Sequence, residues 1–260
     1  MSRILIFILL FNVPCCAKSA DWSARDIGDV VQLGHGAVSL KRQVEGPESV
    51  VLSLAIFDAT HFSFRMMQQP PPLEMATSIA DLLRPSKAVA GVNGGYFDTQ
   101  RFTPSGLLIS NGVSYGTMEV ANPHEGTFLI KDGNPALLPA NEIQTTAGVS
   151  ELVQCSPMLV RAGKAVGGFG DESGPRLPRT FIATDGKNKW AIGVCRKTSL
   201  SSLARMLASP KVITEFKVER ALNLDGGPSS GFWSRDQHGA EDSDKEGTRV
   251  QNIIAIFPRE

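Results

Sequence analysis

Short apolar runs separated by turn residues dominate the first half of the chain. Residues 50–58 and 88–92 are compact, β-branched runs of the kind that form buried strands. Residues 105–112 and 127–133 end in Asn-Gly and Asp-Gly, which tolerate the positive φ of tight hairpin turns. The same pattern returns at 180–195, where two apolar runs flank Asp-Gly-Lys-Asn. The sequence therefore predicts a hairpin-rich sheet.

Two segments have the spacing of helices. In residues 73–83 one helical face carries the apolar side chains Met75, Ile79, Leu82 and Leu83. A second helix begins at Ser199 or Ser201 and ends before Pro210, and residues 253–257 form a last strand. We predict an α+β fold, mostly antiparallel or mixed β-sheet with a few packed helices.

The first 20 residues differ from the rest of the chain. One positive charge precedes a short apolar run, and Pro14 ends it, which is the pattern of a secretory signal peptide. The run is shorter than the roughly 20 residues that a membrane helix needs. We expect residues 1–20 to be removed and residues 21–260, a length typical of one domain, to be exported to the periplasm or the medium.

Cysteine usage follows from this prediction. Cleavage would remove Cys15 and Cys16, and the residues before them match a lipidation motif poorly. The remaining pair, Cys155 and Cys195, predicts one disulfide bond in an oxidising compartment. The alternative is two separate buried thiols.

Charge and metal-ligand patterns narrow the function. The chain has 26 basic and 26 acidic residues and no Lys/Arg stripe, which argues against a nucleic-acid partner. The four histidines lack zinc spacing, and residues 242–247 start like a calcium loop without its closing Glu. No metal or cofactor is expected, and the acidic stretch 237–247 is predicted to be a surface loop.

A first glycine-rich loop, Asn-Gly-Gly-Tyr-Phe-Asp at residues 93–98, follows a buried strand. Gly94 and Gly95 would let the backbone turn with positive φ and present N–H groups to an anion, and Asn93 adds an amide. The simpler alternative is a hairpin turn.

A second loop, at residues 223–231, has the sequence Asn-Leu-Asp-Gly-Gly-Pro-Ser-Ser-Gly. Asn223 and Asp225 alternate with apolar neighbours and so point to one face at a strand end. Asp225 could act as nucleophile or general acid/base, and Ser229 and Ser230 could bind phosphate oxygens. The alternative is a turn with satisfied polar groups.

Together the two loops resemble the signature of the phosphodiester glycosidase family. Residues 104–112, 156–160 and 178–185 are similar to further family segments in the same order, although Ser156 and Ala183 stand where Gly is common. The resemblance spans about residues 50–257. It implies hydrolysis of a sugar-1-phosphodiester, such as a GlcNAc-1-phosphodiester, at the anomeric carbon.

The resemblance also suggests roles for individual residues. Asp225, with Asp98 as a second carboxylate and Asn223 beside it, would carry the chemistry. An Arg can clamp a phosphodiester with two parallel hydrogen bonds, so Arg179 is the main phosphate candidate and Arg249 a weaker one. The predicted substrate contacts are Asn93, Gly94, Gly95, Arg179, Thr180, Gly226, Gly227, Ser229, Ser230 and Arg249.

Two alternatives stay open. The cleft could bind an envelope glycan or phosphate-bearing polymer without cleaving it, because a fold does not guarantee chemistry. A phosphodiesterase that cuts on the other side of phosphorus would release sugar phosphate.

Overall fold

A computed structural model describes residues 21–120 and 125–259. The predicted signal peptide, residues 1–20, lies outside the described residues. All the strand pairs found in the described chain are antiparallel, and strands far outnumber helices. The fold is thus mostly antiparallel β, with less helix than the α+β prediction implied.

The largest sheet has eight strands in the order β1-β2-β3-β16-β15-β17-β13-β14. Its strands are β1 (Ser23–Gly34), β2 (Ala37–Glu45), β3 (Val50–Asp58), β13 (Met158–Arg161), β14 (Lys164–Ala165), β15 (Leu177–Thr184), β16 (Lys189–Thr198) and β17 (Arg220–Asn223). The predicted hairpin is confirmed, because Thr180 pairs with Val194 and Thr184 with Trp190.

Two five-stranded sheets and one small hairpin complete the strands. The β5 sheet, in the order β19-β18-β5-β20-β4, contains β4 (Phe62–Gln68), β5 (Ala90–Asn93), β18 (Phe232–Arg235), β19 (Glu241–Asp244) and β20 (Asn252–Pro258). The β10 sheet, in the order β11-β10-β12-β8-β9, contains β8 (Leu108–Ser110), β9 (Val113–Tyr115), β10 (Gly126–Lys131), β11 (Asn134–Pro139) and β12 (Val149–Cys155). The hairpin pairs β6 (Phe97–Asp98) with β7 (Thr103–Pro104).

The helices are short. The predicted second helix is confirmed as α2 (Leu200–Ala208), whose N-cap Ser199 accepts a hydrogen bond from the Ser202 N–H. The predicted helix over residues 73–83 is wrong in extent. Only α1 (Ile79–Leu83) is α-helical, preceded by the 3₁₀ turn η1 (Leu73–Met75). Two more 3₁₀ turns are η2 (Ala140–Glu142) and η3 (Gly227–Ser229).

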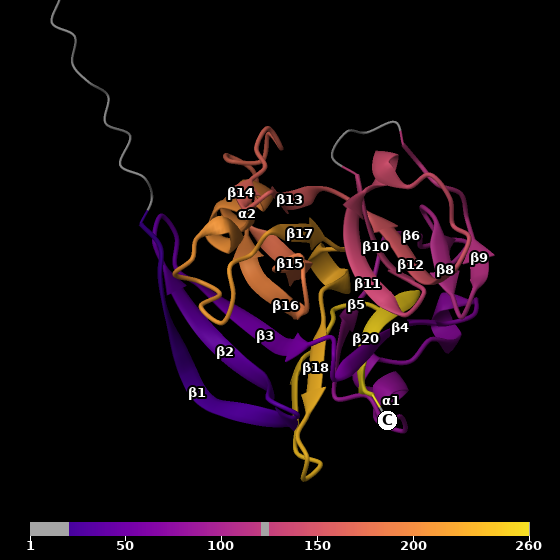
Figure 1. Ribbon diagram of the computed structural model, residues 1–260, viewed down its shortest axis with the longest axis horizontal. Coiled ribbons are helices and arrows are strands. Elements are labelled where there is room, and N and C mark those ends of the chain that lie inside the picture. Colours follow the sequence, from indigo (N-terminus) through magenta and orange to yellow (C-terminus); the bar gives the residue numbers. More distant parts are fainter. Residues whose placement is uncertain (1–20, 121–124, 260) are drawn as a thin grey trace, which may run out of the picture.

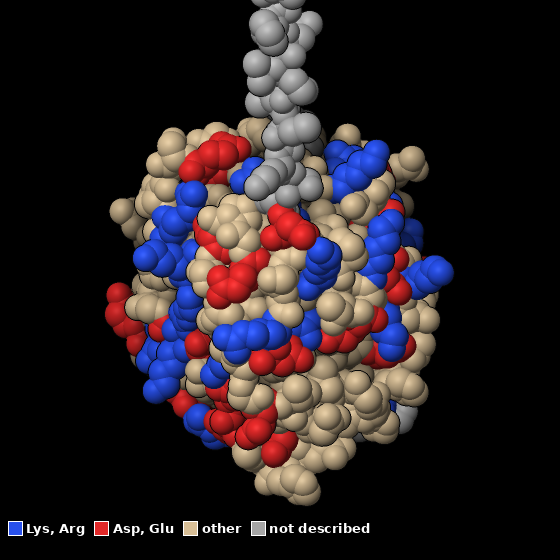
Figure 2. Space-filling model, turned by 90° about the vertical axis from the view of Figure 1, so that its left-hand side faces the viewer, with Lys and Arg blue, Asp and Glu red and all other residues tan. Residues whose placement is uncertain are grey.

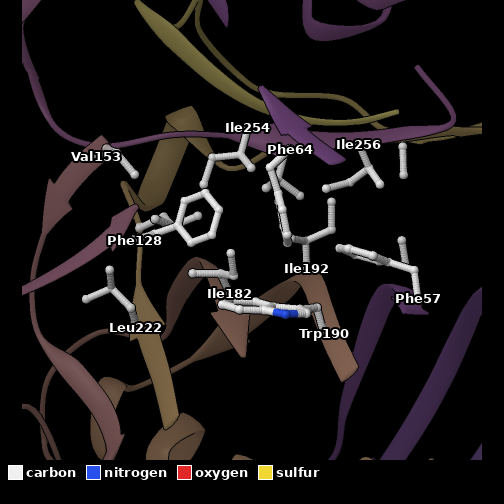
Figure 3. Packing of buried hydrophobic residues seen from close by; sticks show 14 of the residues in the cluster. Phe57, Phe64, Phe128, Val153, Ile182, Trp190, Ile192, Leu222, Ile254 and Ile256 are labelled. Atoms are coloured by element: carbon white, nitrogen blue, oxygen red, sulfur yellow. The ribbon is translucent and has the colours of Figure 1, made fainter. Parts of the chain in front are cut away.

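The central strands of the eight-stranded sheet are buried on both faces, and β16 shows how its sequence achieves this. Trp190, Ile192 and Val194 point into a cluster shared with the β5 and β10 sheets. Ala191 and Cys195 point the other way, into a cluster with α2. This alternation follows from the two-residue period of a strand. Figures 1 and 3 show the layers and the first cluster, where Phe64 and Phe128 face Trp190 across the interface.

The two cysteines lie on opposite sides of this sheet, so the predicted disulfide is wrong. Cys155 ends β12 and belongs to the cluster between the sheets, whereas Cys195 belongs to the cluster with α2. Both are free thiols, and burial raises the pKa of each to about 12. The alternative of two separate buried thiols describes them correctly.

We expect Cys155 and Cys195 to resist alkylation in the folded protein, because buried thiols of high pKa form little thiolate. Both should become labelled once the protein is unfolded, with or without reductant. Peptide mass mapping after labelling measures this directly. A disulfide-linked pair of peptides from these two positions would contradict the structure.

The acidic stretch 237–247 is not a plain surface loop, contrary to the prediction. Its central residues form β19, which pairs with β18. Asp242 lies 2.9 Å from the Lys41 ammonium, and Asp244 lies 3.3 Å from the Arg196 guanidinium. These carboxylates fix the strand against the eight-stranded sheet.

Charged side chains of both signs are interspersed over much of the face shown in Figure 2. Across the described residues, none of the helices has the length and apolar character needed to span a bilayer.

Candidate active site

The two glycine-rich loops meet at the ends of two strands that belong to different sheets. The early loop leaves β5 after Asn93, and the late loop leaves β17 after Asn223. The Asp225 N–H donates to the Gly94 carbonyl at 3.0 Å. Segments 130 residues apart in sequence therefore form one structure.

Asn93 holds this structure together from inside the protein. The side chain is fully buried, and its Nδ2 donates to the Asp225 carbonyl at 2.7 Å. Its Oδ1 accepts from the Thr180 hydroxyl at 2.7 Å and from the Gly231 N–H at 3.1 Å. Asn93 was expected to orient the sugar, but these bonds make it an internal brace between three segments.

The early glycines serve close packing and not an anion site, which corrects the prediction. Neither Gly94 nor Gly95 has positive φ. A Cβ on Gly94 would lie 1.9 Å from the Asn252 Oδ1, and one on Gly95 would lie 2.6 Å from Val153. Their N–H groups already donate to the Asn252 carbonyl and Oδ1, at 2.8 and 2.7 Å. Only one of the five loop glycines, Gly227 in the late loop, has positive φ, at 58°.

Asn223 presents an unpaired oxygen toward the site. Its Nδ2 lies within 3.0 Å of the Tyr96 hydroxyl, the Ser156 carbonyl and the Leu224 carbonyl. Its buried Oδ1 has no hydrogen-bond partner among the described residues. The Tyr96 hydroxyl donates to the Ser156 carbonyl at 2.8 Å, and the ring is 37% exposed. Asn223 and Tyr96 are thus fixed to one backbone carbonyl.

Arg179 approaches the late loop from β15. A Cβ on Gly226 would lie at an ordinary contact distance of 3.6 Å from the Arg179 Nη1 and closer, at 3.1 Å, to the Pro178 carbonyl oxygen, so the guanidinium lies next to this glycine. The Arg179 Nη2 lies 3.8 Å from a carboxylate oxygen of Asp171. Its Nε is buried and finds no partner in the part of the chain that the structure describes.

Asp225 carries the chemically distinctive carboxyl group. Burial raises its pKa above the ordinary value, although hydrogen bonds from the Ser229 side chain and the Gly226 N–H oppose that shift. The Gly226 bond is 2.8 Å long. A carboxyl group with a raised pKa in a half-buried position suits a general acid.

Three buried polar atoms of this site lack hydrogen-bond partners within the described chain: Arg179 Nε, Asn223 Oδ1 and Ser230 Oγ. An unpaired buried polar atom costs about 1–3 kcal/mol, so each of these atoms calls for a partner from outside the chain, such as a ligand or a water molecule. They offer a donor, an acceptor and a hydroxyl beside Asp225. This set can recognise a polar, anionic molecule.

Comparison with known proteins agrees with this site. The family model described as phosphodiester glycosidase matches residues 86–257, which include both loops. This chain belongs to the phosphodiester glycosidase family. No curated protein sequence matches the chain.

Two solved structures share the fold. The catalytic domain of zebrafish N-acetylglucosamine-1-phosphodiester alpha-N-acetylglucosaminidase, auto-inhibited by its pro-peptide, superimposes with a TM-score of 0.61 at 16% identity. The match covers 94% of this chain and 85% of that one. A hypothetical protein from Synechocystis has a TM-score of 0.58 at 14% identity, over 93% of this chain and 68% of that one. At these identities the likeness concerns the fold alone.

Two predicted site residues of this phosphodiester glycosidase have other partners. The Asp98 carboxylate accepts hydrogen bonds from the Arg101 and Gln100 N–H groups, which lower its pKa and close its own turn. Arg249 lies 3.6 Å from Glu246 and is half exposed. The structure thus shows Asp98 and Arg249 in local interactions.

Ser156 and Ala183 stand where the family commonly has Gly, and the local structure accommodates both side chains. Ser156 takes part through its carbonyl, which every residue offers. Ala183 is buried on β15 and points into the cluster with α2, on the same side as Phe181. Neither substitution places a side chain between Arg179 and the late loop.

Sequence reasoning gave no role to three residues near the site: Tyr96, Asp171 and Asn252. Tyr96 was visible as the aromatic residue of the early loop. Asn252 starts β20, and Asp171 lies in a loop rich in glycine and acidic residues, so neither position has a local signal. No cluster of three or more potential metal ligands occurs among the described residues.

Proposed function

We propose that this phosphodiester glycosidase hydrolyses a sugar-1-phosphodiester, of which a GlcNAc-1-phosphodiester is the model, and releases the free sugar. The observation that carries the proposal is the half-buried Asp225 carboxyl, whose pKa is raised, on the loop whose Gly226 lies against the Arg179 side chain. Glycosidic cleavage needs an acid at the departing oxygen, and a phosphodiester needs a cation. Asp225 supplies the acid from the late loop, and Arg179 supplies the cation from β15.

In the proposed reaction, Arg179 binds the non-bridging phosphate oxygens through Nε and a terminal nitrogen. Asp225 donates its proton to the oxygen between C1 and phosphorus as the C1–O bond breaks. Water adds its oxygen to C1, and one of its protons restores Asp225. The products are the free sugar and a phosphate monoester. Asn223 Oδ1 accepts a hydrogen bond from a sugar hydroxyl, and Ser230 donates to the phosphate.

The location of the protein is part of the proposal. Residues 21–260 form one domain that acts after export, on sugar phosphodiesters or envelope glycans that bear them. We assign no step to nucleic acid, metal or membrane.

Turnover in ¹⁸O-labelled water tests the reaction. Purified protein should release free sugar from a GlcNAc-1-phosphodiester, with the label in the sugar because the C1–O bond breaks. Label in phosphate, together with sugar phosphate as product, would identify a phosphodiesterase instead. Binding without any product would identify a glycan- or phosphopolymer-binding protein.

Arg179→Lys should raise the KM for this substrate about tenfold, because Lys cannot form two parallel hydrogen bonds to phosphate. Steady-state kinetics measures the change. Arg249→Lys is the matched control and should change KM little, since that side chain is paired with Glu246. If KM rises more in Arg249→Lys than in Arg179→Lys, the phosphate is bound by Arg249 and not by Arg179.

A further inference from the structure

A carboxylate that the proposed reaction does not use faces the guanidinium of Arg179. Asp171 belongs to the strap, which we define as residues 166–176 between β14 and β15. Its Oδ2 lies 3.8 Å from the Arg179 Nη2, and both side chains are less than 20% exposed. The strap thus brings a negative charge against the proposed phosphate-binding cation.

Asp171 is fixed by bonds that do not depend on Arg179. Its carboxylate accepts from the Ser201 hydroxyl at 2.8 Å, from the Ser201 N–H at 3.2 Å and from the Leu200 N–H. These groups lie in the first turn of α2, where a negative charge is favoured by the helix dipole. Burial would raise the pKa of Asp171, but the bonds from Ser201 and Leu200 and the charge of Arg179 lower it below its ordinary value.

The strap itself is clamped by Arg176. Its guanidinium donates to the carbonyls of Glu172 and Gly174, at 3.0 and 3.1 Å, and its Nε donates to Glu48 at 3.1 Å. Because Glu48 lies outside the strap, this arginine ties the strap to the turn between β2 and β3. The position of Asp171 is therefore set before any ligand binds.

The charges around Arg179 do not sum to a strongly cationic site. Asp171 faces it from the strap with a negative charge, whereas Tyr96 on the early loop and Cys195 on β16, whose pKa values burial raises, are neutral neighbours. Asp225 follows on the late loop, next to the Gly226 that Arg179 packs against. One guanidinium thus shares its surroundings with two carboxyl groups. A ligand with two negative charges meets repulsion that a ligand with one avoids.

We propose that Asp171 is a positioning residue that holds Arg179 by its Nη2 and selects singly charged phosphodiesters over doubly charged phosphate monoesters. The inference rests on the proposed function, because it takes Arg179 as the phosphate ligand. Nη2 carries two N–H groups, so one can point to Asp171 while the other, parallel to the Nε N–H, stays available to the substrate. Asp171 also disfavours rebinding of the phosphate monoester product once that product has released its second proton to water, which happens above a pKa of about 6.

A pair of uncleavable ligands tests this selectivity by calorimetry. The pair is a GlcNAc C-glycosidic difluoromethylene phosphonate, which can carry two negative charges, and its monomethyl ester, which carries one. Binding is compared at about pH 8 and at about pH 5, on either side of the second phosphate pKa of about 6. At the higher pH the wild-type protein should bind the monomethyl ester about tenfold more tightly than the free phosphonate. At the lower pH this difference in affinity should disappear.

Asp171→Asn should bring the two affinities at the higher pH to within about twofold, while the amide oxygen can still accept from the N–H groups at the start of α2. Asp171→Ser, also neutral, repeats the test if the Asn variant unfolds. Glu172→Gln is the matched control, because Glu172 also accepts from the Ser201 hydroxyl, at 2.8 Å. It should keep the wild-type ratio.

The outcomes separate the two hypotheses. If neither phosphonate binds the wild-type protein, the proposed function fails. If both bind and the neutral variants keep the wild-type ratio, the role of Asp171 is wrong while the site stands. If Glu172→Gln changes the ratio of the two affinities as much as the Asp171 variants do, the effect comes from the loss of any nearby negative charge. That result would also overturn the inference.

Discussion

Asp225→Asn is expected to lower kcat for a sugar-1-phosphodiester about 10³-fold while the protein stays folded. The amide fits the same space but has no proton to give to the departing phosphate oxygen. KM should change little, because Arg179 and Asn223 remain to bind the substrate. Steady-state kinetics on the purified variant, with circular dichroism as a check of the fold, measures the effect.

The pH dependence follows from the same carboxyl group. A general acid works only while protonated, so kcat should fall as pH rises through the raised pKa of Asp225. The unfolded chain loses this proton at a lower pH than the folded protein does. Ionisation therefore costs stability as pH rises above the unfolded pKa, up to the folded one. Asp225→Asn should unfold at the same or a higher temperature than wild type at neutral pH.

Asp98→Asn is the matched control for this prediction. It makes the same chemical change at a different carboxylate. The hydrogen bonds described for Asp98 come from the Gln100 and Arg101 N–H groups of its own turn. We expect it to keep most of the activity. If Asp225→Asn keeps full activity and Asp98→Asn loses it, then Asp98 and not Asp225 is the acid.

Local patterns predicted the fold where the partners are close in sequence. Residues 180–195 form the expected hairpin because both strands and their turn lie within one stretch. The predicted helix over residues 73–83 does not form in full, because the Thr77 N–H donates to the Gln69 side-chain oxygen at 2.8 Å. The backbone between η1 and α1 is extended at this point. Helical spacing alone could not reveal that contact.

The acidic stretch shows the same limit over a longer distance. Its composition is typical of a surface loop, yet Asp242 and Asp244 find cations on β2 and β16. These partners precede them by some 50 to 200 residues. The strand β19 therefore pairs with cations that no local window of the sequence contains.

The candidate site was predictable in part. The family signature singled out Asn93, Thr180 and Asp225, which the structure brings together through the Asn93 side chain. The reason for the early glycines was missed, because Asn-Gly-Gly is also the composition of a turn. Only the fold shows that Asn252 fills the space where a side chain at position 94 would lie.

Gly94→Ala should therefore be severely destabilising, by about 3 kcal/mol, and should abolish turnover. The new Cβ would lie 1.9 Å from the Asn252 Oδ1 and 3.2 Å from its carbonyl oxygen, so the loop must move. Because the Gly94 carbonyl accepts from the Asp225 N–H, that movement displaces the proposed acid. Urea unfolding measures the loss of stability.

A double-mutant cycle with Asn252→Ala separates the clash from other effects. Asn252→Ala alone removes the oxygen that binds the Gly95 N–H and should destabilise by about 1–3 kcal/mol. In the double variant the clash with that oxygen disappears, so the combined loss should be clearly smaller than the sum of the two single losses. Gly167→Ala is the control, since no atom lies within 4 Å of its Cβ position. Additive losses would show that contact with Asn252 is not why residue 94 is a glycine.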